Sequence, residues 1–418
     1  MKNLIFLFLF SACTFFSDKV QTEKANELDY KRNEKTYCKV PTSDTVVVGS
    51  NELIQSLFLN FLKDLKQQEI QLSFVETSVL WSLLQINLRP DLSSPTARFQ
   101  VIYQNGSKPV YLDYSPQQKS KNTYAFLYGL NDILKKNSPQ KSLRQLNQLL
   151  DLYFPDQMYV SEELASFFKS NELALTNLEW AKTPFTRGDE MLKKGERLPK
   201  IRFENLNRLL EQTTTDNIKI STQLYNKKMP NDLNMNCNFE VSVYEKSLFL
   251  ISKNDVQGNM FGLSKGKAFF LATTNQDISE LKNIPESFFF DGNPKTRMPA
   301  VCQFEQSKQY STWLVANQSR DPGQHLYHLY QYGVKNIHST EDMTSILKFS
   351  RHLFLTDPLR LVFESQRGSK QQLDELLKLN VPIYHTFTLG NVWGHIQFNN
   401  GIRQFFVDER NLGYLSCQ

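Results

Sequence analysis

The first residues of the chain most constrain what this sequence can become, because they decide in which compartment the rest folds. Lys2 supplies a positive charge, residues 4–10 form an unbroken apolar run, and the small residues Ser11 and Ala12 precede Cys13. A positive start, a short apolar core and small residues before a cleavage point are typical of a secretory signal. The run is too short to cross a bilayer, which takes about 20 apolar residues. We therefore expect an exported protein with its signal at residues 1–12.

The residues around Cys13 resemble the end of the signal in a bacterial lipoprotein precursor. Phe10-Ser11-Ala12-Cys13 follows the Leu-small-small-Cys pattern of a lipobox, except that Phe10 stands where Leu or Val is usual. The resemblance implies that Cys13 is lipidated, becomes the first mature residue and anchors the protein to a lipid bilayer. It also implies a place in the cell envelope, facing the periplasm or the exterior. The alternative is an ordinary cleaved signal and a secreted protein.

Four cysteines remain once Cys13 is assigned to the anchor: Cys38, Cys237, Cys302 and Cys417. An even number of widely spaced cysteines in an exported chain predicts two disulfides. No C-x-x-C pair is present, which argues against zinc binding and thioredoxin-like chemistry. Of the three possible pairings we predict the nested one, Cys38–Cys417 and Cys237–Cys302. The outer bridge would tie the chain ends together, and the inner one would staple a region of strands.

The composition is that of a globular protein, with 40% hydrophobic and 22% charged residues and a formal net charge of +5. No dense Lys/Arg block with interleaved aromatic residues occurs, so we expect no nucleic-acid partner. The expected partners are the lipid bilayer and an unknown ligand or envelope protein. The sequence identifies no cofactor.

The hydrophobic patterns predict a mixed α/β (α+β) fold. A polar, lipidated tether is expected at residues 13–36, an N-terminal α/β unit at residues 37–120 and a mainly helical region at residues 121–236. A β-rich segment and a C-terminal α/β unit fill residues 237–418. In that last unit strands alternate with helices, which predicts right-handed crossovers and a mainly parallel sheet.

Within the N-terminal unit, local signals predict the order of the elements. A valine-rich strand at residues 45–48 is followed by a helix with Ser50 as its N-cap. A second strand is predicted at residues 70–75 and a helix around residues 79–86. A hairpin at residues 98–114 is predicted to turn at Asn105-Gly106, a favoured short-turn pair.

Candidate chemistry gathers in the C-terminal unit, which holds every histidine of the chain. His325 and His328 lie three residues apart and share one face of a predicted helix, a spacing found in metal and acid–base sites. Glu364 ends one predicted strand and His385 follows the next. Loops after the strands of an open α/β sheet carry its ligand sites, so we predict these four residues as a catalytic or metal-binding group.

The same loops also carry Arg320, Asp321 and Arg367, which we predict as an alternative site for an anionic or polar ligand. Packed histidines and solvated ion pairs are the structural alternatives to both predictions. No G-x-S-x-G, H-E-x-x-H or P-loop motif is present. We expect a lipoprotein that binds a ligand or partner without chemistry. The alternative is a cell-envelope hydrolase, with metal assistance if the histidines bind a metal, and its site in the C-terminal unit.

Overall fold

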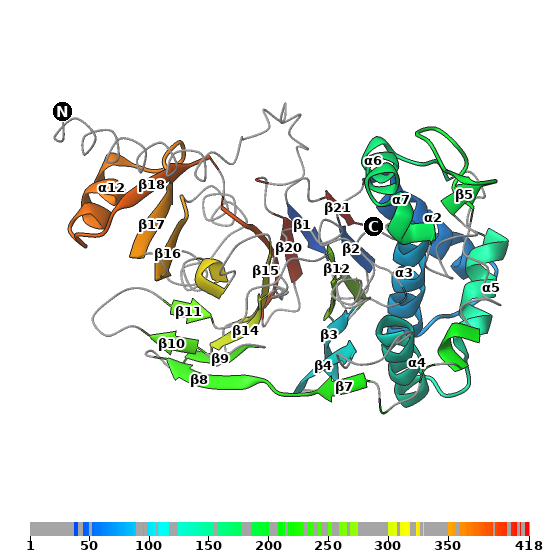
Figure 1. Cartoon of the computed structure of the whole chain (residues 1–418). Coiled ribbons are helices and arrows are strands. Elements are labelled where there is room, and N and C mark those ends of the chain that lie inside the picture. The colour runs from blue at the N-terminus through cyan, green and yellow to red at the C-terminus, as the bar shows by residue number, and fades with distance from the viewer. Residues whose placement is uncertain are drawn as a thin grey trace, which may run out of the picture.

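The computed structural model contains helices and several β-sheets (Figure 1), which confirms the predicted mixed α+β class. It describes residues 37–417 with gaps, of which the longest are residues 275–299 and 330–349. The predicted signal, Cys13, the tether and Ser50 lie outside the described residues. No described helix is long and apolar enough to cross a membrane.

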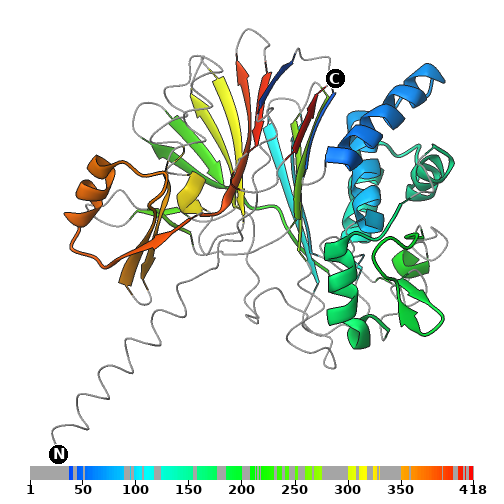
Figure 2. The ribbon, with the colours of Figure 1, turned by 90° about the horizontal axis from the view of Figure 1, so that it is seen from above.

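Two seven-stranded sheets face each other at the centre of the molecule (Figure 2). Sheet A has the order β1-β20-β19-β15-β14-β9-β8, and sheet B has the order β21-β2-β12-β13-β3-β4-β7. The strands of sheet A are β1 Tyr37–Val40, β8 Tyr225–Met229, β9 Leu233–Cys237, β14 Ala300–Gln306, β15 Tyr310–Asn317, β19 Asn391–Phe398 and β20 Arg403–Val407. Those of sheet B are β2 Thr45–Gly49, β3 Arg98–Asn105, β4 Lys108–Pro116, β7 Ile218–Ser221, β12 Asn259–Lys265, β13 Ala268–Thr274 and β21 Tyr414–Cys417.

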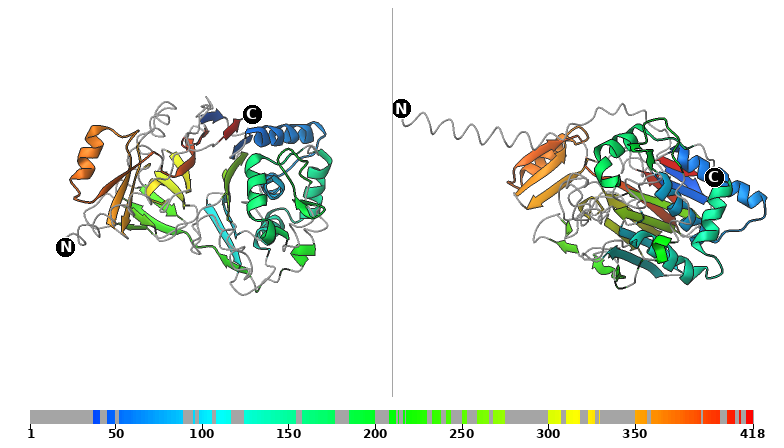
Figure 3. Two further views of the ribbon diagram at one scale, coloured as in Figure 1. Left: turned by 45° about the horizontal axis from the view of Figure 1, so that its top comes forward. Right: turned by 45° about the vertical axis from the view of Figure 1, so that its right-hand side comes forward.

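A layer of helices covers the outer face of sheet B (Figures 2 and 3). It consists of α2 Glu52–Gln67, α3 Phe74–Leu88, α4 Ala125–Asn137, α5 Leu143–Tyr153, α6 Glu162–Ser170 and α7 Glu172–Thr176. Helix α3 is apolar nearly all round because it is enclosed by neighbours and contacts α4, α5 and β12. Helix α4 contacts β3 and β4, and Tyr114 of β4 donates a hydrogen bond to Asp132 of α4 (2.6 Å). The side chain of Tyr114 therefore points to the outer face of sheet B.

On the far side of sheet A lies a smaller unit, with strands β16 His352–Thr356, β17 Leu359–Glu364 and β18 Ile383–Thr386 and helix α12 Lys370–Leu377 (Figure 1). It has a small core of its own, made of Phe354, Leu361, Phe363 and Leu376. Two short hairpins complete the described strands: β5 Thr186–Arg187 with β6 Glu190–Met191, and β10 Val241–Val243 with β11 Leu250–Ser252.

The predicted mainly parallel C-terminal sheet is corrected by the structure. Among the described pairings only β17 with β18 is parallel, and helix α12 joins these two strands as a crossover. The strands on either side of this unit, β15 and β19, pair antiparallel in sheet A. The alternation of strands and helices does not reflect one sheet, because the chain leaves sheet A after β15, builds the small unit and returns to sheet A at β19. Both large sheets also combine strands from the beginning and the end of the chain, because β1 pairs with β20 and β2 pairs with β21.

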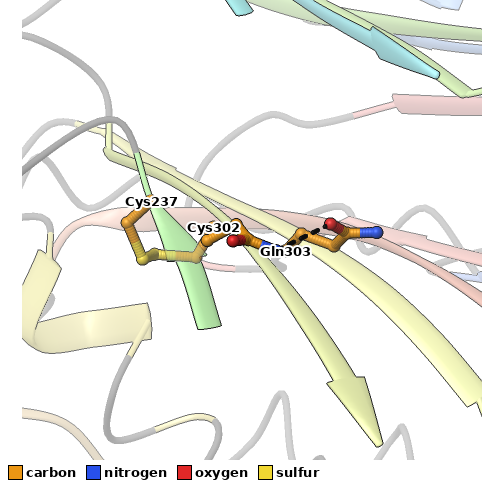
Figure 4. The surroundings of a disulfide bond; sticks show 4 residues. Cys237, Cys302 and Gln303 are labelled. Atoms are coloured by element: carbon orange, nitrogen blue, oxygen red, sulfur yellow. Dashed lines mark hydrogen bonds between the residues drawn. A yellow bond between two sulfur atoms is a disulfide. The ribbon is translucent and has the colours of Figure 1, made fainter. Parts of the chain in front are cut away.

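The predicted Cys237–Cys302 disulfide is present and joins neighbouring strands β9 and β14 (Figure 4). The two residues are register partners, with their Cα atoms 4.2 Å apart. The partner bridge, Cys38–Cys417, stays a prediction. Cys38 lies in β1, Cys417 lies in β21, and these two strands contact each other where the edges of sheets A and B meet.

Candidate functional site

Glu364, predicted as a metal ligand or general base, is a fully buried partner of Arg410. Arg410 donates from Nε to Oε1 and from Nη2 to Oε2 of Glu364, both at 2.7 Å. The backbone N–H groups of Arg351 (2.9 Å) and Leu389 (2.5 Å) donate to the same carboxylate. These four bonds join β17 to the segments before β16, β19 and β21. Such an arrangement is suited to holding the small unit against sheet A rather than to binding a metal ion.

His325 lies in the same buried region, and its charged neighbours act on its protonation. Burial is the largest cause that holds the pKa of His325 well below its ordinary value, followed by the charges of Arg351 and Arg410 and by His352. Burial likewise lowers the pKa of His352 to about 4. Both imidazoles are therefore neutral near pH 7.

The structure does not bring His385 to Glu364. His385 is the register partner of Phe363, and the two rings meet edge to face with centroids 6.5 Å apart. Neighbouring residues of a strand point to opposite faces, so Glu364 points away from Phe363 and from His385. The predicted group is thus divided between the two faces of the β16–β17–β18 sheet. Among the described residues no set of three His, Cys, Asp or Glu side chains is arranged to hold a metal ion.

The remaining predicted site residues fall into two groups. His328, Arg320 and Asp321 lie outside the described residues. Arg367 is described in the turn after β17, where its backbone N–H donates to the carbonyl of Glu364 (3.3 Å).

A second concentration of polar side chains, not predicted from the sequence, lies on the inner face of sheet B. Because Tyr114 points to the helices, its neighbour Asp113 points toward sheet A. Asp113 pairs in register with Gln100 on one side and with Ser221 on the other, so all three share this face. Asp113 and Gln100 are buried, and Ser221 is half-buried.

Hydrogen bonds connect this row to its neighbours. Ser115 donates from Oγ to Asp113 Oδ1 (3.2 Å), and Gln100 donates from Nε2 to the Tyr111 hydroxyl (2.7 Å). Ser221 ends β7, and Thr222, Gln223 and Leu224 lead from there directly into β8 of sheet A. Figure 1 shows this crossing, β7 to β8, as one green ribbon at the bottom of both sheets. The crossing therefore brings a hydroxyl and a buried carboxylate to the boundary between the sheets.

On sheet A, a row of three amides starts at the same crossing. Asn226 of β8 donates from Nδ2 to Asn236 Oδ1 (2.7 Å), and Asn236 of β9 donates from Nδ2 to Gln303 Oε1 of β14 (3.2 Å). Figure 4 shows Gln303 pointing away from the disulfide. Along β14, Gln303 and Val301 point to one face and Cys302 points to the other. Val301 belongs to the hydrophobic core that also contains residues of sheet B. The amide row therefore lies on the face of sheet A that looks toward sheet B.

Polar side chains thus collect on both inner faces next to the crossing, whereas Val301 and Val315, farther along, are apolar. The arrangement offers a hydroxyl nucleophile, a carboxylate and uncharged hydrogen-bonding groups, which are the ingredients of acyl transfer. In the sequence, alternation such as Leu233-Asn234-Met235-Asn236 was indistinguishable from a strand with one solvated face. Only the packing of the second sheet makes Gln100, Asp113 and Gln303 buried.

Comparison of the sequence with protein-family models and with curated proteins gives no match. Solved structures do match in fold. Two structures of the protein LmbA2991 have TM-scores of 0.62 at 8% identity, covering 92% and 91% of this chain and 99% of theirs. A cephalosporin acylase from Bacillus halodurans has a TM-score of 0.61 at 8% identity, covering 94% of this chain and 99% of its own. At this identity the likeness shows a common fold across nearly the whole chain.

Proposed function

We propose that this protein is an exported hydrolase that cleaves the amide bond of N-acyl compounds, with its active site at the β7–β8 crossing. The observation that carries the proposal is the fold shared with a cephalosporin acylase over 94% of this chain. The polar residues of the inner sheet faces support it, because burying polar groups between sheets is less favourable than burying apolar ones, and proteins accept such costs mainly at functional sites. Both observations favour the hydrolase over a protein that only binds.

In this proposal Ser221 is the nucleophile. Its Oγ adds to the acyl carbonyl carbon, the C–N bond breaks, and the amine leaves with the hydroxyl proton. Water then cleaves the acyl ester and returns a proton to Ser221. Asp113 is the register partner of Ser221, and such partners on one face have Cβ atoms about 4.5–5.5 Å apart. Its carboxylate is therefore within reach to orient the hydroxyl and to stabilise the proton in transit.

The test uses the full chain and a panel of N-acyl p-nitroanilides whose acyl groups differ in length and polarity. We expect turnover by the wild type and a loss of at least about a hundredfold in kcat/KM for Ser221→Ala. The matched control is Thr222→Ala, which removes an exposed hydroxyl from the next residue and should stay within threefold of the wild type. Asp113→Asn should lower kcat more than it changes KM.

Mass spectrometry of the quenched reaction should find the acyl group on the peptide that contains Ser221. The proposal fails if Ser221→Ala, shown to be folded by its thermal unfolding, hydrolyses the panel as fast as Thr222→Ala. It also fails if the wild type gives neither turnover nor an acyl adduct. The binding-only function would then be the one to pursue.

We further propose that the enzyme is held at the cell envelope by a lipid on Cys13, as the lipobox-like residues suggest. Cys13→Ser should abolish incorporation of a labelled fatty acid and release the protein from the membrane fraction. Wild-type labelling and membrane retention in this variant would contradict the anchor.

A further inference from the structure

The hydrogen bonds of the amide row Asn226–Asn236–Gln303 all run in one direction, from an exposed end to a buried end. Asn226 is exposed at the edge strand β8, Asn236 is half-buried, and Gln303 is 4% exposed. Each of the first two amides donates to the next, at 2.7 and 3.2 Å. Hydrogen bonds in such a chain polarise one another, so the bonds inside the row are strengthened and its outer amide is held in one orientation.

The row also begins shortly after the proposed nucleophile in the sequence, because only Thr222 to Tyr225 separate Ser221 from Asn226 along the chain. Asn226 and Ser221 both belong to the inner faces, one on each side of the crossing. An oriented, uncharged donor–acceptor group on the strand that follows the nucleophile is suited to hold a polar part of a substrate that extends along the crossing.

We infer that this row is the acyl subsite and that the preferred acyl group carries an uncharged amide. This inference rests on the proposed hydrolase function and names its substrate class. A primary amide has a donor and an acceptor side by side. It can therefore form two hydrogen bonds with the amide of Asn226, one as donor and one as acceptor, as Asn and Gln side chains do with adenine. A carboxylate offers acceptors alone, and an alkyl group offers neither.

The experiment compares three p-nitroanilides of nearly equal shape. Their acyl groups are succinamoyl, which ends in an amide, 4-methylpentanoyl, which replaces that amide by methyl groups, and succinyl, which ends in a carboxylate. For the wild type we expect kcat/KM to be roughly 10- to 100-fold higher for the succinamoyl compound than for either analogue, because a site built for a hydrogen-bonding group rejects the analogue that lacks it. The difference should lie mainly in KM.

In Asn226→Ala the ratio of kcat/KM for the succinamoyl compound to kcat/KM for either analogue should fall close to one. Asn234→Ala is the matched control, because Asn234 lies on the same strand and face as Asn236 but its register partners are Lys228 and Glu305. This control should keep the wild-type preference. Equal rates for the three compounds in the wild type, or an unchanged preference in Asn226→Ala, would overturn the inference and leave the hydrolase function standing.

A binding measurement separates the two proposals if none of the anilides is cleaved. Saturation-transfer NMR with succinamide should show binding to the wild type and to Asn234→Ala, and its loss in Asn226→Ala. That pattern without turnover would support the subsite and contradict the hydrolase function. No binding of succinamide to the wild type would overturn the subsite.

Discussion

At the scale of single residues, Glu364 has the chemistry of a catalytic or metal-binding residue, but in the structure it forms a buried ion pair. Glu364 was selected from the sequence because a carboxylate ended a strand among histidines. The structure surrounds it with Arg410 and two backbone N–H groups, all in the interior. The sequence position of Arg410, far beyond the predicted loops, carried no signal of this pairing. The type of residue was therefore predictable, whereas its partner depended on the tertiary fold.

Removal of this carboxylate should be costly. Glu364→Ala leaves the guanidinium of Arg410 buried without its counter-charge, and breaking a buried pair typically costs about 3–5 kcal/mol. The free energy of unfolding from urea titration measures this loss. Glu375→Ala, on the exposed side of α12, is the control and should change stability by less than about 0.5 kcal/mol. Equal stability of the two variants would refute the anchoring role.

The buried His352 predicts a loss of stability in mild acid. Its pKa is about 4 in the folded protein and about 6.5 in the unfolded chain, so between these values the unfolded state binds the proton and the folded state does not. The contribution of His352 is therefore fully present above pH 6.5 and falls as the pH drops toward 4. Between pH 7.5 and pH 5 the loss is about 2 kcal/mol. In His352→Gln the pH dependence of unfolding should be smaller by this amount, and an identical profile would contradict the assignment.

At the scale of elements, local signals predicted the strand at residues 45–48, the helix around residues 79–86 and the hairpin strands, and they failed at one strand. The hairpin was confirmed, since β3 ends at Asn105 and β4 begins at Lys108. Its predicted turn at Asn105-Gly106 was one residue early, because Asn105 pairs in register with Lys108 and the connection is residues 106–107, which lie outside the described residues. The strand predicted at residues 70–75 was wrong, because Ser73 and Glu76 form a capping box that starts α3. There Glu76 N–H donates to Ser73 Oγ (3.2 Å), and Ser73 N–H donates to Glu76 Oε2 (2.8 Å). The apolar residues around the box belong to the buried helix.

The contact between α4 and sheet B depends on a glycine. A Cβ atom at Gly129 would lie 2.2 Å from a ring carbon of Phe99 and 2.8 Å from one of Tyr114. Gly129→Ala should therefore destabilise the protein by about 1–3 kcal/mol through overpacking, although alanine favours a helix. Thermal unfolding measures the effect, with the exposed Lys135→Ala on the same helix as control. A gain in stability for Gly129→Ala would show that the helix can move away from the sheet.

At the scale of the whole molecule, neither the two facing sheets nor the inter-sheet site followed from the sequence. Periodicity identifies a strand but not its partner, and here the partners are distant: Cys38 of β1 pairs in register with Phe405, and Val46 of β2 pairs with Cys417. Each of the two large sheets combines strands from several of the segments predicted along the chain. Asp113, Gln100 and Gln303 therefore came together only through topology.

The contact between the edge strands β1 and β21 supports the predicted Cys38–Cys417 bridge. Peptide mapping under non-reducing conditions should find this pair together with Cys237–Cys302. Closing so long a loop stabilises by at most about 6 kcal/mol in the chain-entropy model. Cys38→Ser with Cys417→Ser should therefore unfold at a lower temperature than the wild type. Free thiols at both positions in the exported protein would contradict the bridge.

The pairing of β1 with β20 and of β2 with β21 also determines when each large sheet can be completed during folding. The strands synthesised first must wait for those synthesised last, so neither large sheet can be completed until the end of the chain is available. During that interval the early strand edges remain open to wrong partners. A chain shortened before β20 would lose both closing strands at once, and we expect it to aggregate rather than to fold in part.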